Sequence, residues 1–515
     1  MARLFTLMVA VQSGKQGLYA FAIGGNVNSI LLMVLLYNII VIGGIGKYLS
    51  WQAAKNQAVT DMALGGRDAG VAMFSVTIAI TYLGSAHVYG LMEMSFSLGA
   101  VALWFCFAHT ILLCVICLGT GKWIRRVGTA TIPELIGKLY NKKLRTYTAC
   151  VAAMVVFGLV TLEAQTLGIG ISAMSGWPLG WSAVLGAAIG TAYVCMGGIK
   201  QTMWVNLVNA IVMYVAVITA GIYLAFVLPE GWQGVSDYYH QRNETFKLSI
   251  FSKPDLLFSF ALAAIFSVVF SQSVNQQGMQ AAMSARDEKT IHRSLWIAAP
   301  INGLFGVFPV LVGIAAATIP EFAELGPKLA GAALIVNLLP TWLVVLLQAG
   351  FLGALLSTFA MSALAPATIL AKDVVGASLN KELSPVSEKK LIRYAIVGIG
   401  FTAAVMTLFI QPNVILAITW LFAWLVPFFF IIIAGLFWKR NSTVAALVLV
   451  LSWGVNLLWS FTDIKSVLGL SVLENAHVVA IVSLFVTFVG NLLIVKFEPP
   501  LLRLTTNNEA QAISG

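Results

Sequence analysis

The chain has 515 residues, of which 59% are hydrophobic and only 10% are charged. Water-soluble domains carry about a quarter charged residues, so this composition excludes a soluble protein. The formal net charge of +10 does not indicate nucleic acid binding, because apolar stretches of the ~20 residues needed to cross a bilayer recur along the whole chain. We therefore predict an all-α polytopic membrane protein.

Arg3 and Lys15 interrupt the apolar pattern of residues 1–27, which we interpret as an external leader that does not span the bilayer. About 13 transmembrane helices are predicted after it. They cover about 28–48, 71–95, 98–120, 146–172, 177–197, 202–228, 256–283, 294–318, 341–371, 394–410, 414–437, 442–461 and 478–496. Residues 498–515 form a short polar tail.

Lysine and arginine predict the orientation, since cytoplasmic loops are enriched in them. If the loop after the first span is cytoplasmic and the sides alternate, 23 of the 30 lysines and arginines face the cytoplasm. This predicts a multi-pass protein of the plasma (inner) membrane, with its N-terminus outside and its C-terminus cytoplasmic. No stretch between spans is long enough for a catalytic domain or a signalling module, which argues against an enzyme and makes a transporter-like membrane sensor a weaker alternative.

The segment from Gln348 to Thr368 is apolar, yet small residues and hydroxyls crowd its middle. On a helix Ala354, Ser357 and Thr358 fall at i, i+3 and i+4, so they share one face. Two neutral hydroxyls beside a backbone that small side chains leave uncovered can replace part of the water shell of a small hard cation. The same residues also suit close helix packing and hydrogen bonding within their own helix, and the segment alone leaves both interpretations open.

Six local patterns occur in order along the chain. They are Ala63–Arg67 (ALGGR), Thr131–Leu135 (TIPEL), Gly197–Trp204 (GGIKQTMW), Asn275–Gln276, Gln280–Arg286 (QAAMSAR) and Phe437–Arg440 (FWKR). In this combination the chain resembles the sodium:solute symporter family, which includes sodium/proline, pantothenate and sodium/glucose carriers. The resemblance implies a five-plus-five inverted-repeat core at 71–437, a first helix and cytoplasmic loop at 28–70, and accessory helices at 438–497.

The resemblance also implies a function, namely sodium-coupled import of a small polar organic solute such as an amino acid, carboxylate or sugar. It places sodium between the broken first core helix and the eighth core helix. The matching ligands are the backbone carbonyls of Ile80, Leu83 and Ala354 and the hydroxyls of Ser357 and Thr358. Many members of the family carry an acidic residue in the fifth core helix that can serve a second sodium site. This chain has Asn206 at that position, so we expect a single coupled sodium.

Glu163 is the clearest acid inside a predicted span, and ionisable groups at membrane depth are costly enough to suggest a function. It could pair with a substrate cation, carry a proton or hydrogen-bond structurally, and a proton-coupled carrier using Glu163 is the main alternative function. His87 lies beside the expected helix break at Gly84, where the resemblance implies substrate contact and a structural histidine is the alternative. Glu93 is expected to be solvated near an outer helix end, and His109 to be structural.

Ser267, Ser271 and Asn275 are spaced i, i+4, i+8, which predicts a polar stripe along one helix face. Hydrogen bonding between helices explains such a stripe, while the resemblance implies substrate contacts by Ser267, Ser271 and Asn302. No cofactor is expected apart from sodium as the coupling ion. The expected partners are the solute, sodium and the lipid bilayer, with no nucleic acid and no obligate protein partner.

Overall fold

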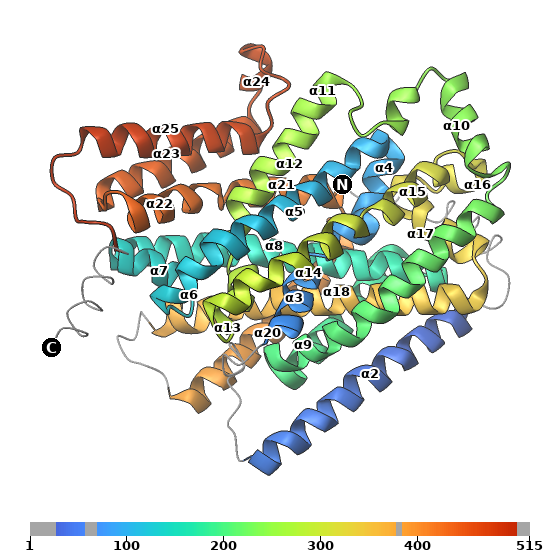
Figure 1. Ribbon diagram of the computed structural model, residues 1–515, viewed down its shortest axis with the longest axis horizontal. Helices are drawn as coiled ribbons and strands as arrows, with labels where there is room; N and C mark the ends of the chain where they lie inside the picture. Colours follow the sequence, from blue (N-terminus) through green and yellow to red (C-terminus); the bar gives the residue numbers. More distant parts are fainter. Residues whose placement is uncertain (1–26, 57–69, 377–383, 502–515) are drawn as a thin grey trace, which may run out of the picture.

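The computed structural model describes residues 27–56, 70–376 and 384–501. Within these ranges the chain is mainly helical, and an isolated antiparallel β-bridge joins Arg440 to Glu498. Figure 1 shows the helices gathered into one bundle, with α2 along one side and α23 and α25 on the opposite side. This architecture confirms the all-α polytopic prediction.

In chain order, the helices described before residue 285 are α2 (Val27–Asn56), α3 (Val71–Thr81), η1 (Ala86–Gly90), α4 (Leu91–Leu98), η2 (Gly99–Leu103), α5 (Trp104–Val115), η3 (Ile116–Thr120), α6 (Gly121–Val127), α7 (Ile132–Leu139), α8 (Lys142–Ser175), α9 (Leu179–Val227), α10 (Gly231–Gln241), η4 (Thr245–Leu248), α11 (Pro254–Leu256), η5 (Leu257–Leu262), α12 (Ala263–Phe266), η6 (Ser267–Ser271) and α13 (Gln276–Ser284).

The remaining helices are α14 (Glu288–Phe305), α15 (Val307–Ala316), α16 (Pro320–Ala323), α17 (Pro327–Leu338), α18 (Thr341–Ile369), η7 (Leu370–Gly376), α20 (Pro385–Phe409), α21 (Val414–Ala423), α22 (Val426–Phe437), α23 (Ser442–Phe461), α24 (Ile464–Val467) and α25 (Asn475–Leu493).

The described residues contain 11 helical segments long and apolar enough to cross a membrane, so the predicted count of 13 is not confirmed. Two features account for the difference. Helix α3 has 11 residues, which at 1.5 Å per residue span about 17 Å of a ~30 Å hydrocarbon core. The stretch Leu179–Cys195, within the predicted span 177–197, is also shorter than a candidate span, whereas Thr202–Val227 is long enough. The two stretches belong to α9, one continuous element of 49 residues.

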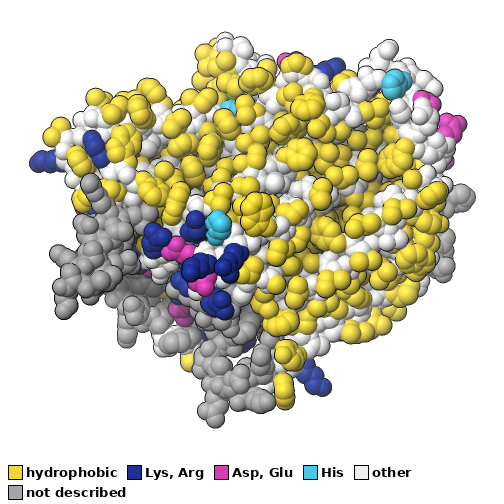
Figure 2. Space-filling model, in the orientation of Figure 1, with side chains coloured by type: hydrophobic (Ala, Val, Ile, Leu, Met, Phe, Trp, Pro, Cys, Tyr) yellow, Lys and Arg dark blue, Asp and Glu magenta, His cyan; other side chains and the backbone are white. Residues whose placement is uncertain are grey.

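The outer surface of the bundle is apolar, as lipid contact requires. On α9 the exposed large side chains recur every three or four residues, at Ile211, Val215, Ile218, Ile222 and Phe226. This spacing puts them on one helix face. Figure 2 shows apolar side chains over most of one side of the molecule, with lysines and arginines gathered near the end where α6 and α13 lie.

Helix α18 lies at the centre of the bundle, and every residue from Leu347 to Ile369 is buried. Its glycines let α9 approach closely: a Cβ at Gly350 would lie 2.8 Å from the Cα of Met213, and one at Gly353 would lie 2.1 Å from Nδ2 of Asn209. Helix packing by small residues therefore operates on the α9 side of α18. Thr358 contacts α3 instead, so its hydroxyl lies on another face than the packing glycines.

Two helices are interrupted inside the bundle. The first stops at Thr81 and resumes at Ala86, and the second stops at Ser271 and resumes at Gln276. Such interruptions free backbone groups, which membranes tolerate only where protein or a cavity satisfies them. Both interruptions border the same small cavity, which makes this region the candidate functional site.

Candidate functional site

Four of the five residues predicted to bind sodium contribute oxygens to one cluster between α3 and α18. The Thr358 hydroxyl oxygen lies 3.4 Å from the Ile80 carbonyl oxygen and 3.1 Å from that of Ala354. The Ser357 hydroxyl lies 3.0 Å from the same Ala354 carbonyl. Leu83 follows in the interruption, where its backbone N–H donates to the Ile80 carbonyl over 2.9 Å.

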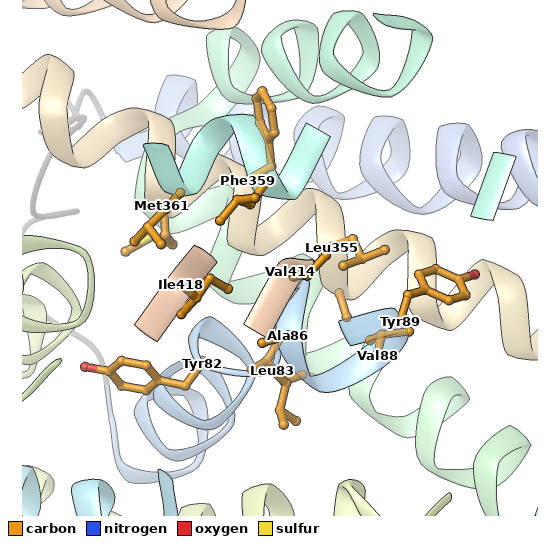
Figure 3. Close-up of a cluster of buried hydrophobic side chains, with 14 of the residues drawn as sticks. Tyr82, Leu83, Ala86, Val88, Tyr89, Leu355, Phe359, Met361, Val414 and Ile418 are labelled. Atoms are coloured by element: carbon orange, nitrogen blue, oxygen red, sulfur yellow. The ribbon is translucent and has the colours of Figure 1, made fainter. Parts of the chain in front are cut away.

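These separations suit a small hard cation. With oxygen ligands at about 2.4 Å, an octahedral arrangement places neighbouring oxygens about 3.4 Å apart. The hydroxyls of Ser357 and Thr358 donate to backbone carbonyls, so their lone pairs stay free to accept a cation. Figure 3 shows the apolar surroundings, with Leu355 and Phe359 from α18 and Leu83 from the interruption. All four oxygens, two carbonyl and two hydroxyl, are neutral.

A small cavity adjoins this cluster, with a volume of about 30 Å³. That volume holds about two water molecules. Thr358 borders both the cavity and the oxygen cluster, so one side chain connects them. The other polar side chains that line the cavity are Thr81, Tyr82, Ser85, His87, His109, Glu163, Gln272 and Gln277.

Glu163 projects from α8 to the start of the resumed first core helix. Its Oε1 accepts hydrogen bonds from the Ser85 hydroxyl at 2.9 Å and the Ser85 backbone N–H at 3.2 Å, and its Oε2 lies 3.1 Å from the same N–H. Gly84 explains how the carboxylate fits, because a Cβ there would lie 2.5 Å from both Glu163 Oε1 and Thr358 Cγ2. The carboxylate thus caps a helix N-terminus, which carries a positive partial charge.

His87 and His109 form a ring pair in the cavity wall. Their ring centroids lie 4.3 Å apart in an edge-to-face arrangement. Nδ1 of His109 lies 2.9 Å from the Phe105 carbonyl oxygen, so that nitrogen carries the proton. His87 is 1% exposed and neither of its ring nitrogens has a hydrogen-bond partner. His109 therefore borders the cavity as well as bonding within its own helix, and nothing in its local sequence indicated that it lines the cavity.

Three of the predicted substrate residues lie outside the cavity lining and bond to backbone instead. Ser267 donates to Ala264 over 3.2 Å, and Ser271 donates to the Ser267 carbonyl over 2.5 Å. Asn302 donates to the Ala79 carbonyl over 3.2 Å, which fixes the backbone next to Ile80. Gln272, from the second interruption, and Gln277, from the start of α13, line the cavity in their place.

Glu93 is buried, so its expected solvation was wrong. Its side chain is 4% exposed and its Oε1 lies 3.5 Å from the Lys328 ammonium nitrogen. Its Oε2 accepts from the backbone N–H of Val414 at 3.1 Å. Lys328 also donates to the carbonyls of Gln411 and Pro412, over 3.0 and 2.7 Å. This cluster joins α4, α17 and the segment before α21.

Asn206 is buried in α9, and neither atom of its amide has a hydrogen-bond partner. As the sequence shows, a neutral amide stands where the resemblance suggested a carboxylate. Within the described residues, no group of three or more His, Cys, Asp and Glu side chains could hold a metal ion.

Comparisons with known proteins show which proteins the chain is similar to. The model of the sodium:solute symporter family matches residues 63–452. A sodium/glucose cotransporter of Vibrio parahaemolyticus is 23% identical over 461 residues, which are 81% of this chain and 82% of that protein. The human sodium-coupled monocarboxylate transporter 2 is 23% identical over 283 residues, 52% of this chain and 43% of that one.

Among solved structures, a Na+-coupled sialic acid symporter superposes with a TM-score of 0.75. The match covers 91% of this chain and 98% of that chain, at 14% sequence identity. At this identity the likeness shows the fold, which is that of a transporter with discontinuous helices. It thereby supports the inverted-repeat core expected from the sequence.

Proposed function

Because the chain belongs to the sodium:solute symporter family, we propose that it imports a small polar organic solute together with sodium. The observation that carries this proposal is the oxygen cluster of Ile80, Ala354, Ser357 and Thr358 between α3 and α18. Neutral oxygens bind a cation without a fixed charge that would trap it, so the ion is released on the other side of the membrane.

Sodium at this cluster ties the first core helix to α18, and the conformation in which they meet is favoured when the ion is bound. The solute binds at the adjoining cavity, which must widen from its volume of about 30 Å³ to admit it. Thr358 borders both the cavity and the oxygen cluster, so it couples the two ligands. The driving force is the sodium gradient together with the membrane potential, worth about 2.3 kcal/mol per charge per 100 mV. We further propose a plasma membrane location, with the N-terminus outside and the C-terminus in the cytoplasm.

Proton coupling through Glu163 is the second candidate, because Glu163 is buried and takes part in no ion pair found in the described part of the chain. The variant Glu163→Gln separates the two, since an amide cannot cycle a proton. A sodium-coupled carrier retains sodium-driven uptake in this variant at saturating sodium, whereas a proton-coupled carrier loses all gradient-driven uptake.

The decisive experiment is uptake into proteoliposomes of a panel of amino acids, carboxylates and sugars. An inward sodium gradient is compared with an equal potassium gradient, at constant pH and with the membrane potential clamped. We expect at least one solute to accumulate only with sodium. Accumulation driven equally well by a proton gradient without sodium would replace the proposal with the second candidate.

A further inference from the structure

The resumed halves of both interrupted helices begin at the cavity, and the protein's own oxygens cap each start. The first, 13 residues long through η1 and α4, is capped by Glu163 at Ser85. The second, α13, is capped by the Asn275 side chain, whose Oδ1 accepts from the Gln277 N–H at 3.4 Å. In transporters with broken helices, such N-termini are the groups that receive anionic parts of a substrate. Here each N-terminus already has an acceptor of the protein's own for one of its N–H groups.

The rest of the cavity wall offers an anion neutral hydrogen-bond donors but no positive charge. Among the described residues that line it there is no lysine or arginine, and Glu163 is the one acid. The wall also offers groups that lack partners: the Thr81 hydroxyl and both ring nitrogens of His87 are buried without a hydrogen bond. A hydroxyl or a neutral imidazole accepts a hydrogen bond as well as donating one, so these groups can receive donors from a solute.

The Glu163 carboxylate also lies beside the proposed sodium cluster. A single methyl group at Gly84 would lie 2.5 Å from both Glu163 Oε1 and Thr358 Cγ2, and the Thr358 hydroxyl belongs to that cluster. A buried carboxylate without a basic partner must be neutralised by a proton or paired with a cation. Under the proposed function, sodium at the neighbouring oxygen cluster supplies that cation.

We infer that Glu163 is a built-in counter-anion, standing where a solute carboxylate would otherwise meet the helix N-terminus and the sodium ion. This inference deepens the proposed function and rests on it. The transported solute therefore carries no carboxylate, and it presents hydroxyl or amino donors to the cavity. Monocarboxylates and sialic acid, which give two of the similar proteins their names, are then poor ligands of this chain.

The first test is chemical rescue of Glu163→Ala in the purified full-length protein. The measurement is the sodium concentration that gives half of the sodium-dependent rise in Tm. We expect this concentration to increase about tenfold or more, as for loss of a charge-assisted contact. Acetate or formate should restore it, while acetamide and formamide should not, because only the anions replace the lost charge at the helix end.

Two further variants keep this test decisive. Glu163→Gln retains the size and an acceptor oxygen, so it should fold, bind sodium more weakly and show no response to acetate. Glu321→Ala removes an exposed carboxylate on α16 and should leave sodium binding unchanged. A Glu163→Gln protein with wild-type sodium affinity would overturn the inference, and so would a folded Glu163→Ala protein that ignores acetate and formate.

The second test compares solutes of different charge by the rise in Tm that each produces in saturating sodium. It uses two matched series. One series is ethanolamine, ethylene glycol and glycolate, and the other is glucosamine, glucose and glucuronate. We expect stabilisation of the wild-type protein by an amine or neutral member and none by either carboxylate. Preference for glycolate or glucuronate, or no preference within either series, overturns the inference. If sodium itself fails to stabilise the wild type, the proposed function fails instead, so the two failures are distinct.

Discussion

The hydroxyl oxygen of Thr358 lies 3.4 Å from the carbonyl oxygen of Ile80, although 278 positions separate the two residues along the chain. Because the first core helix stops at Thr81, the Ile80 carbonyl accepts from the Leu83 N–H, three residues on, in a tightened last turn. The Thr358 hydroxyl on α18 reaches the same carbonyl. This is the structural meeting point of the two elements that the proposed sodium ion would hold together.

The variants Ser357→Ala and Thr358→Ala each remove one hydroxyl oxygen from the cluster and change the packing little. We expect the sodium concentration for half-maximal uptake to rise about tenfold in each, since one good polar contact is worth about 1.4 kcal/mol. The maximal rate at saturating sodium should change less. Sodium titration of uptake in proteoliposomes measures both quantities.

Thr368→Ala is the matched control. Thr368 is also buried on α18, and its hydroxyl donates within the helix to the Leu364 carbonyl over 2.8 Å. The control should keep the wild-type sodium dependence. If Ser357→Ala and Thr358→Ala behave like this control, the assigned sodium site is wrong.

Gly84→Ala tests the close approach between Glu163 and Thr358. The added methyl would lie 2.5 Å from an atom of each, far inside van der Waals contact, so both side chains must move. We expect a loss of about 1–3 kcal/mol in stability and severe loss of sodium-driven uptake. Gly398→Ala, on α20 with open space around the new methyl, should be neutral in thermal melts and transport.

Lys328→Met tests the buried ion pair with Glu93. Removing the ammonium leaves a carboxylate that is 4% exposed without its cation, and breaking a buried pair costs about 3 kcal/mol. Restoring stability with the double variant Lys328→Met, Glu93→Gln would show that the cost lies in the unpaired charge. Thermal unfolding in detergent provides the comparison.

The exposed pair of Lys465 and Glu474 serves as the reference, with its charged atoms 3.9 Å apart. Lys465→Met should change stability by no more than about 0.5 kcal/mol. Equal effects of Lys328→Met and Lys465→Met would mean that the Glu93 pair contributes no more than a surface contact.

Sequence periodicity was enough to group Ala354, Ser357 and Thr358, because residues three and four apart share a helix face whatever the tertiary structure. Ile80 could not be found this way, since a backbone carbonyl leaves no trace in side-chain type, and it came from the family resemblance alone. Glu93 was misplaced because its burial depends on Lys328, 235 positions later. Such pairing is invisible to local pattern.

The number of spans could not be predicted from local pattern either, because it depends on where helices continue and where they stop. Hydropathy marks where the chain is apolar, but it does not report whether a helix continues between two apolar stretches, as α9 does. It also does not show that a helix stops inside the bundle, as the first core helix does at Thr81. Backbone interruptions depend on partners such as Glu163 that arrive from other helices.

Asn206 leads to the last prediction. Its buried amide has no hydrogen-bond partner for either atom, and a neutral oxygen offsets little of the cost of dehydrating a cation. With one sodium site, uptake should depend on sodium without cooperativity. The measurements are the Hill coefficient of sodium-activated uptake and the charge moved per solute.

Asn206→Asp places a carboxylate at that buried position, where it must be neutralised by a proton or a cation. If neighbouring oxygens complete a second site, sodium activation becomes sigmoidal; if they do not, the variant loses activity, because it buries an uncompensated charge. Asn206→Leu is the control, since it removes the amide without adding charge and should keep a Hill coefficient near one. A wild-type protein that already shows cooperative activation and carries two sodium ions per solute would contradict the single-site prediction.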